Sequence, residues 1–283
     1  MPAAEIPVGV TLAVLAAGFL HALWNALLKS ASGEPMLDTA LIVAGATIVC
    51  APLVLVVPLP ARAAWPFALA SMLVHFAYYV TLAGAYRRGD LSFAYPLMRG
   101  VAPLLVTLAG VAVLGEHLRP NAIAGIALIS GGIILIAWFA SGRHTASAVG
   151  WAIANAVIIA TYTLIDGAGA RAAGNPWSYA FWLMFLEGIP FVGWIMWLQR
   201  GAAIPYLLRR WRRGMLGGAA SVAAYAIALW AMTRAPVAVV AALREVSVVF
   251  AAILGAVFLN ERFGWRRLAG AASVAAGVAA LRF

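Results

Sequence analysis

Seven ionisable side chains lie within long apolar stretches of this sequence. They are His21, His75, Arg99, Asp166, Glu187, Arg244 and Glu245. Placing a charge in the hydrocarbon of a bilayer costs about 3 kcal/mol even on the lowest scales, and such residues usually pair or line a path for substrates, ions or protons. These seven positions therefore define the candidate site, and the chemistry of each residue type limits what the site binds.

The two arginines are the residues best suited to bind an anionic group. Arg99 and Arg244 each lie eight residues after the start of an apolar run, which places them about 12 Å along a helix from its end. A guanidinium binds a carboxylate or phosphate through paired hydrogen bonds. The structural alternative is that each arginine holds helix carbonyls or pairs with Glu245 or Asp166. Both interpretations are compatible with the sequence.

The remaining ionisable groups are candidates for a proton or for a polar part of a ligand. Glu245, Glu187, His21 and His75 either carry a coupling proton or form static ion pairs and hydrogen bonds. Glu245 directly follows Arg244, which favours an ion pair. Asp166 and Asn25 are expected to bind a polar or amino group, and a shift of 141 positions relates them.

Aromatic residues recur on the helical faces that carry these polar groups. Tyr95 lies one turn before Arg99, so the two share a face. The predicted wall of the cavity consists of Trp24, Tyr79, Tyr95, Tyr162 and Tyr225. A mostly apolar cavity with a few polar groups is typical of small-molecule sites. The alternative for each aromatic residue is ordinary packing or lipid contact.

No motif for catalysis, metal binding or cofactor binding accompanies these residues. The histidines at positions 21, 75, 117 and 144 have no ligand-like spacing to carboxylates or to Cys50. No phosphate-cradling loop and no nucleophile motif occurs. We therefore expect no enzymatic activity, no cofactor and no metal.

The composition places these residues in a membrane protein. Of 283 residues, 65% are hydrophobic and 10% are charged, and the mean hydropathy is +0.98. Soluble domains are about half apolar and about a quarter charged, so a soluble enzyme, a nucleic-acid-binding protein and a disulfide scaffold are all disfavoured. The net charge of +10 is carried mostly by short segments between apolar runs, as is typical of topology signals.

Ten runs are long enough to cross a bilayer as helices, because about 20 apolar residues are needed. They cover residues 8–28, 37–58, 65–86, 91–114, 121–140, 147–170, 176–198, 214–233, 236–259 and 265–281. We expect an all-α integral membrane protein, in the bacterial cytoplasmic (inner) membrane.

The two halves of the chain repeat one another. A shift of 145 positions maps Arg99 onto Arg244 and Glu116 onto Glu261 without a gap. With five spans in each half, the second half enters the membrane from the opposite side. The sequence thus predicts two inverted five-helix repeats, residues 1–143 and 144–283. This arrangement is common in secondary transporters, which bind substrate near the midplane.

Basic residues are distributed unequally between the two predicted ends. With the N-terminus in the cytosol, twelve Lys and Arg residues would lie outside and five inside, so the positive-inside rule favours both termini outside. Arg209, Arg210, Arg212 and Arg213 alternate with apolar and aromatic residues. They either fix the topology or bind anionic lipid headgroups.

The fifth and tenth spans are rich in small residues. Ala127 with Gly131, and Ser273 with Gly277, have the four-residue spacing that allows helices to approach closely. We expect these spans to pack the two halves together, and a homodimer contact is the alternative. Glu116, at the end of its span, is interpreted as a structural residue.

Several segments resemble the EamA-type branch of the drug/metabolite transporter superfamily. The resemblance is carried by residues 21–29, 94–103, 114–116, 243–250 and 259–261. It extends over both repeats and implies a central cavity formed by the first four spans of each half. Members of this family export amino acids, other small metabolites or drugs.

The residues and the resemblance together predict a secondary transporter for a small polar metabolite, such as an amino acid or a related zwitterion or anion. Export by alternating access through a midplane cavity is the expected mode. Two alternatives stay open: a flippase for lipid-linked or phosphate-bearing headgroups, and a membrane subunit that transports nothing. No nucleic-acid partner is expected.

Overall fold

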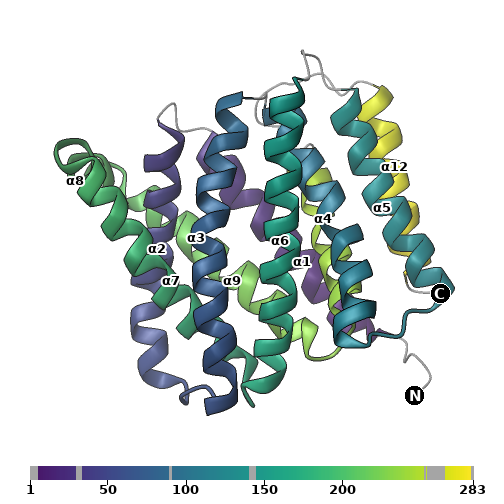
Figure 1. The fold of residues 1–283 in the computed structure, drawn as a ribbon, viewed down its shortest axis with the longest axis horizontal. Coiled ribbons are helices and arrows are strands. Elements are labelled where there is room, and N and C mark those ends of the chain that lie inside the picture. The colour runs from purple at the N-terminus through teal and green to yellow at the C-terminus, as the bar shows by residue number, and fades with distance from the viewer. Residues whose placement is uncertain are drawn as a thin grey trace.

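The computed structural model describes residues 6–29, 34–88, 91–139, 145–251, 253 and 265–281. Within these ranges the regular structure is helical (Figure 1). The helices are α1 (Val8–Lys29), α2 (Pro35–Val56), the short 3-10 helix η1 (Arg62–Ala64), α3 (Trp65–Arg88), α4 (Leu91–Leu114), α5 (Pro120–Trp138), α6 (Ala146–Ala172), α7 (Pro176–Leu198), α8 (Arg200–Arg209), α9 (Trp211–Met232), α10 (Val237–Arg244) and α12 (Trp265–Ala280).

Local signals explain where several helices begin. The hydroxyl of Thr145 accepts a hydrogen bond from the backbone N–H of Ala148 at the start of α6, over 3.1 Å. The side chain of Asn175 does the same for Trp177 at the start of α7, over 3.0 Å. Such caps satisfy backbone donors that a helix leaves unpaired at its N-terminus. Gly174, which precedes the second cap, has a φ of +73°, a conformation that favours glycine.

Eight of the described helices are long and apolar enough to cross a membrane, so the protein is an all-helical, multi-pass integral membrane protein. The prediction of ten spans is met only in part. The tenth span appears as the 16-residue α12. The ninth predicted span is interrupted, because α10 ends at Arg244 and helical structure resumes at residue 247.

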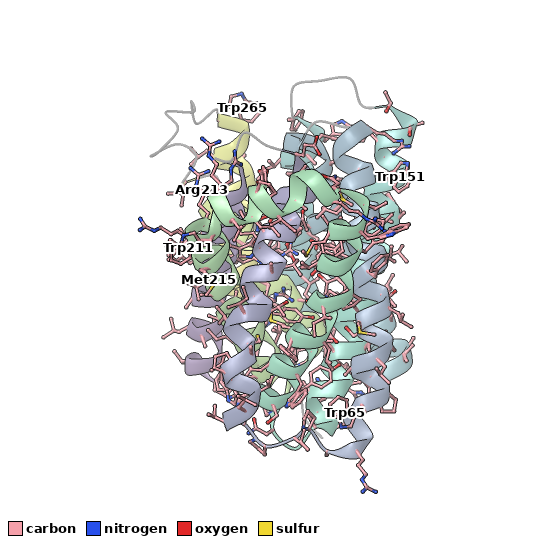
Figure 2. All side chains as sticks on the ribbon, turned by 90° about the vertical axis from the view of Figure 1, so that its left-hand side faces the viewer. Trp65, Trp151, Trp211, Arg213, Met215 and Trp265 are labelled. Atoms are coloured by element: carbon pink, nitrogen blue, oxygen red, sulfur yellow. The ribbon has the colours of Figure 1, made fainter. Side chains whose placement is uncertain are left out.

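The surface of the bundle suits a bilayer. Leu55 is 85% exposed and Val113 is 76% exposed, as expected for side chains that face lipid. Figure 2 places Trp65 toward the lower end of the bundle and Trp265 toward the upper end. Tryptophan collects at the two membrane–water interfaces, so these residues mark the two levels between which the helices cross.

The two halves interlock. The most extensive helix contacts include α3 with α6, α2 with α9, α4 with α6 and α5 with α12, and each joins a helix of one half to a helix of the other. The core is therefore shared between the repeats. The boundary predicted between residues 143 and 144 lies outside the described residues.

Glycines bring α5 and α12 into close contact, as expected for a joint between the halves. A Cβ at Gly277 would lie 2.7 Å from the carbonyl oxygen of Gly125, and one at Gly125 would lie 2.7 Å from that of Gly277. The hydroxyl of Ser273 donates to the carbonyl of Leu128 over 2.8 Å. The prediction for Gly131 was wrong, because nothing lies within 4 Å of its Cβ position. Spacing alone did not identify the face of α5 that meets α12.

The contact between α5 and α12 generates a prediction. We expect Gly277→Ala to lower the melting temperature of the detergent-purified protein, because the added methyl forces two backbones apart at a cost of about 1–3 kcal/mol. Gly131→Ala on α5 is the matched control. It adds the same methyl in open space and should leave the melting temperature unchanged or raise it slightly. Equal effects of the two substitutions would contradict the close contact.

Candidate functional site

A buried ion pair joins the halves where α10 ends. Arg99 on α4 and Glu245 are each 4% exposed, and Nε of Arg99 lies 2.6 Å from Oε2 of Glu245. The backbone N–H of Glu245 donates to Ala242, three residues back, over 3.0 Å, so the regular helix ends at this residue. The sequence suggested Arg244 as an ion-pair partner of its neighbour Glu245, but the structure brings Arg99 to this carboxylate instead.

Arg244 has a different environment. It is 8% exposed, and its guanidinium carbon lies 5.2 Å from the centroid of the Tyr225 ring. Among the described residues no carboxylate forms an ion pair with Arg244. The face of the Tyr225 ring attracts this guanidinium through a cation–π contact. Arg99, by contrast, has the carboxylate of Glu245 beside it and a buried Nη2 with no hydrogen-bond partner among the described residues.

Asp166 on α6 lies at the centre of a tyrosine cluster. Its side chain is fully buried, and its two carboxylate oxygens accept hydrogen bonds from the hydroxyls of Tyr179, over 3.0 Å, and of Tyr225. Tyr225 therefore connects the buried anion Asp166 to the buried cation Arg244. This places Asp166, Tyr225 and Arg244, three of the predicted site residues, in one contiguous group.

His75 and Glu187 form a second polar pair beside this group. Nδ1 of His75 lies 3.4 Å from Oε2 of Glu187, and the hydroxyl of Tyr79 donates to Oε1 of the same carboxylate over 3.4 Å. The ring of His75 stacks on Tyr162, with centroids 4.2 Å apart and planes inclined by 29°. Ser71 lies within hydrogen-bond distance of His75, at 3.0 Å. The four helices α3, α6, α7 and α9 contribute side chains to this region.

Three of the predicted residues on α1 bond mainly to one another. The indole N–H of Trp24 donates to Nδ1 of His21 over 3.3 Å, and the amide of Asn25 donates to the backbone carbonyl of His21 over 2.8 Å. A Cβ at Gly18, three residues before His21, would lie 3.6 Å from the backbone oxygen of Arg244, so α1 packs against the end of α10 here. Tyr95 on α4 also lies near Arg99.

The structure adds residues that the sequence did not reveal. Tyr179 is completely buried and binds Asp166, and Tyr78 lies edge-on to Tyr162 with centroids 5.7 Å apart. Tyr179 stands in the first turn of an aromatic-rich span, where tyrosine is expected at the membrane interface. Its link to Asp166 crosses two helices, and no spacing within one helix indicates such a contact.

Glu116 fixes the position of α10. Its carboxylate accepts hydrogen bonds from the N–H groups of Val237, over 2.7 Å, and Ala238, over 3.3 Å, at the start of the helix. It also pairs with Arg171 at 2.9 Å. A carboxylate at a helix N-terminus is stabilised by the free N–H donors and the helix dipole. This contact agrees with the structural role expected of Glu116.

Comparisons with known proteins agree with this architecture. The chain resembles a solved crystal structure described only as that of a protein, with 20% identity over 96% of each chain and a TM-score of 0.72, which shows the fold alone. No curated protein sequence matches the chain. The model of the EamA-like transporter family matches twice, over residues 8–138 and 146–283, in agreement with the predicted repeats. The chain therefore belongs to the EamA-like transporter family.

Proposed function

We propose that the protein is a secondary transporter that exports a small polar metabolite, an amino acid or a related zwitterion or anion, by alternating access across a bacterial cytoplasmic membrane. The observation that carries this proposal is the environment of Arg244. Its guanidinium is buried within the bundle and has no carboxylate partner among the described residues. A charge left this way in a low-dielectric interior is costly, and an anionic substrate group offsets that cost.

Arg99 and Arg244 have different roles in this proposal. Arg99 is neutralised by Glu245 at 2.6 Å, so it sets the electrostatic environment and orients the end of α10. Arg244, one residue before Glu245, binds the substrate carboxylate. A discontinuous helix near the midplane is a common feature of transporter binding sites, and the end of α10 at Arg244 provides one.

The organic part of the substrate is assigned to the aromatic wall. Tyr225 lies between Arg244 and Asp166, and Tyr162 stacks on His75, which lies beside Glu187. Tyr79 and Tyr95 extend the wall along α3 and α4, and Trp24 borders it on α1. Rings with one polar edge hold an apolar group while their hydroxyl groups stay hydrogen-bonded.

The buried charges do not balance by themselves. The buried charged groups of this region are Arg99, Arg244, Asp166, Glu187 and Glu245. Two cations thus face three carboxylates, which leaves one negative charge unless His75 or a carboxylate binds a proton. A zwitterionic substrate adds no net charge, so the one negative charge remains when it is bound. One proton bound in the same region would neutralise that charge. We assign this proton to the pair of His75 and Glu187, and thereby couple transport to protons.

The first test concerns Arg244. Detergent-purified protein is screened by thermal denaturation against amino acids, organic anions, organic cations and phosphate-bearing headgroups. A ligand at a hundredfold over its Kd stabilises a protein by about 2.7 kcal/mol. We expect a shift with one carboxylate-bearing class, and its loss in Arg244→Gln. Arg62→Gln, at an exposed position at one end of the bundle, is the control that keeps the shift.

Three outcomes would contradict this assignment. An unchanged shift in Arg244→Gln would remove the guanidinium from the substrate site. A shift with phosphate-bearing headgroups alone would favour a flippase, and no shift with any compound would favour a membrane subunit without transport activity.

A second test separates the coupling proton from substrate binding. In proteoliposomes with the compound identified by the screen, we expect Glu187→Gln to abolish uptake driven by a pH gradient and to keep substrate exchange at equal pH. The amide removes the carboxylate that the proton neutralises. Tyr79→Phe is the matched control, because it removes the hydrogen bond to Glu187 and keeps its charge. Gradient-driven uptake that persists in Glu187→Gln would contradict the assignment.

We propose further that the basic segment after α8 binds anionic lipid headgroups. Tyr206 donates a 2.5 Å hydrogen bond to Asp38 on α2, and Arg210 donates one of 2.5 Å to the Tyr206 hydroxyl. Burial and the bond to Asp38 raise the pKa of Tyr206 to about 12, so the hydroxyl stays protonated as a donor. Leu208 and Trp211 remain 68% and 57% exposed, which suits insertion at the membrane surface. Figure 2 shows Trp211 and Arg213 on the same side of the bundle.

The proposed binding of anionic lipid predicts that the melting temperature depends on the charge of the lipid. We expect the protein to melt at a higher temperature in nanodiscs with phosphatidylglycerol than in phosphatidylcholine alone, and Arg212→Gln with Arg213→Gln to reduce the difference. Arg62→Gln with Arg119→Gln, at the opposite end, is the control. If both double variants reduce the difference equally, the effect is one of net charge and the segment has no specific role.

The homodimer stays a prediction. The glycines at which α5 and α12 meet, Gly125 and Gly277, are occupied by the contact between these two helices, so they are not available to a second copy of the chain.

A further inference from the structure

A cavity opens at one end of the second half, and Arg244 is not among the residues that line it. It has a volume of about 350 Å³ and lies where α6 ends, α7 begins and α9 ends; these turns are at the lower end of the bundle in Figure 1. The residues that line it are Ala170, Arg171, Gly174, Pro176, Trp177, Trp230, Thr233 and Arg234. Its size is at the lower end of the range for small-molecule sites.

Arg171 is a fixed part of the cavity wall. Its Nε donates to the carbonyl of Met232 over 2.9 Å, and its Nη2 donates to Glu116 over 2.9 Å and to the carbonyl of Ala235 over 3.2 Å. Glu116 neutralises this guanidinium, and the carbonyls at the end of α9 hold it in place. Arg171 therefore gives the cavity shape without leaving it a free charge.

Arg234 supplies the free charge. It is exposed, and its guanidinium carbon lies 4.8 Å from the centroid of the Trp230 ring. Within the described part of the chain it has no carboxylate partner, and none of the described lining residues is acidic. The cation–π contact orients the guanidinium and leaves its N–H donors available, so an anion at this position would meet a prepared partner.

Aromatic surface and a helix start adjoin this cation. Trp177 and Trp230 stack with centroids 6.3 Å apart and planes inclined by 23°. At the start of α7 the N–H groups of Trp177 and Ser178 already donate to the side chain of Asn175, so the donors for an anion come from Arg234. An apolar or flat group fits against the two indoles, while the charge of Arg234 favours an anionic group.

We propose that this cavity is a second binding site, for a molecule that joins a carboxylate or phosphate group to an aromatic or apolar part. Arg234 binds the anionic group, Trp177 and Trp230 contact the apolar part, and Arg171 with Glu116 holds the wall. The proposal does not depend on transport or on the role of Arg244.

The cavity is close to Asp166 along the chain and apart from it in space. Arg171 follows Asp166 by five residues on α6, about 7.5 Å along the helix axis. Neither Asp166 nor its two tyrosine partners, Tyr179 and Tyr225, lines the cavity.

The test uses benzoate and phenyl phosphate as probes, and benzyl alcohol as the uncharged counterpart. Calorimetric titration of the full-length protein in phosphatidylcholine nanodiscs should show binding of at least one anion and tenfold weaker or no binding of benzyl alcohol. We expect Arg234→Gln to weaken anion binding at least tenfold, because a charge-assisted hydrogen bond is lost. Arg234→Lys, which keeps the charge, should recover part of the affinity.

Two controls separate this site from others. Arg62→Gln, in an exposed segment at the same end of the bundle, should bind the probes as the parent protein does. Arg244→Gln should also keep probe binding, which shows that the probes do not occupy the central region. Unchanged affinity in Arg234→Gln, or loss in Arg244→Gln alone, would overturn the proposal, as would no anion binding by the parent protein.

A lipid arm identifies the source of the anionic group. The titration is repeated in nanodiscs that contain phosphatidylglycerol. If the probes bind more weakly in these nanodiscs, a lipid headgroup competes for the site. Arg62→Gln should then show the same decrease in probe affinity as the parent protein. Probe binding independent of lipid charge identifies a soluble anion. Either result supports the anionic site at Arg234.

Discussion

The requirement that buried charges be neutralised within the bundle governs the centre of this protein. Arg99 and Glu245 meet this requirement together at 2.6 Å, and each comes from a different half of the chain. Removing one partner of such a pair leaves an uncompensated charge, at a cost of about 3–5 kcal/mol. The pair therefore holds α4 to the end of α10. Because Arg244 directly precedes Glu245, the same pair also positions the arginine that faces Tyr225.

The two repeats differ at the position of Glu245, and the packing of the first half explains the difference. Gly100 occupies the position in the first half that corresponds to Glu245. A Cβ there would lie 2.7 Å from a side-chain carbon of Ile134 and 3.1 Å from the carbonyl of Ser130. The first half uses the position for close packing of α4 on α5, so it has no room for a carboxylate. The second half has a carboxylate at this position, just after α10 ends, so charge is distributed asymmetrically between the two halves.

Family membership and this asymmetry together frame the proposed function. The EamA-like transporter family match covers both repeats, and the inverted arrangement brings Arg99 and Glu245 together from opposite ends of the bundle. In the proposed function, Arg244 binds the anionic group and the pair of His75 and Glu187 holds the proton. The proposed site at Arg234 lies apart from this region, at one end of the bundle.

The sequence by itself determined the class of the protein, most of its helical spans, its internal repeat and the buried ionisable residues. These follow from composition and from periodic matches, because the cost of moving a side chain into hydrocarbon depends on its own chemistry. Only the tertiary structure decided which groups meet. It paired Arg99 with Glu245, joined Tyr179 to Asp166, interrupted the helix after Arg244 and turned Gly131 away from α12. Such contacts depend on how helices distant in sequence rotate and pack against one another, and spacing within a single helix carries no record of that.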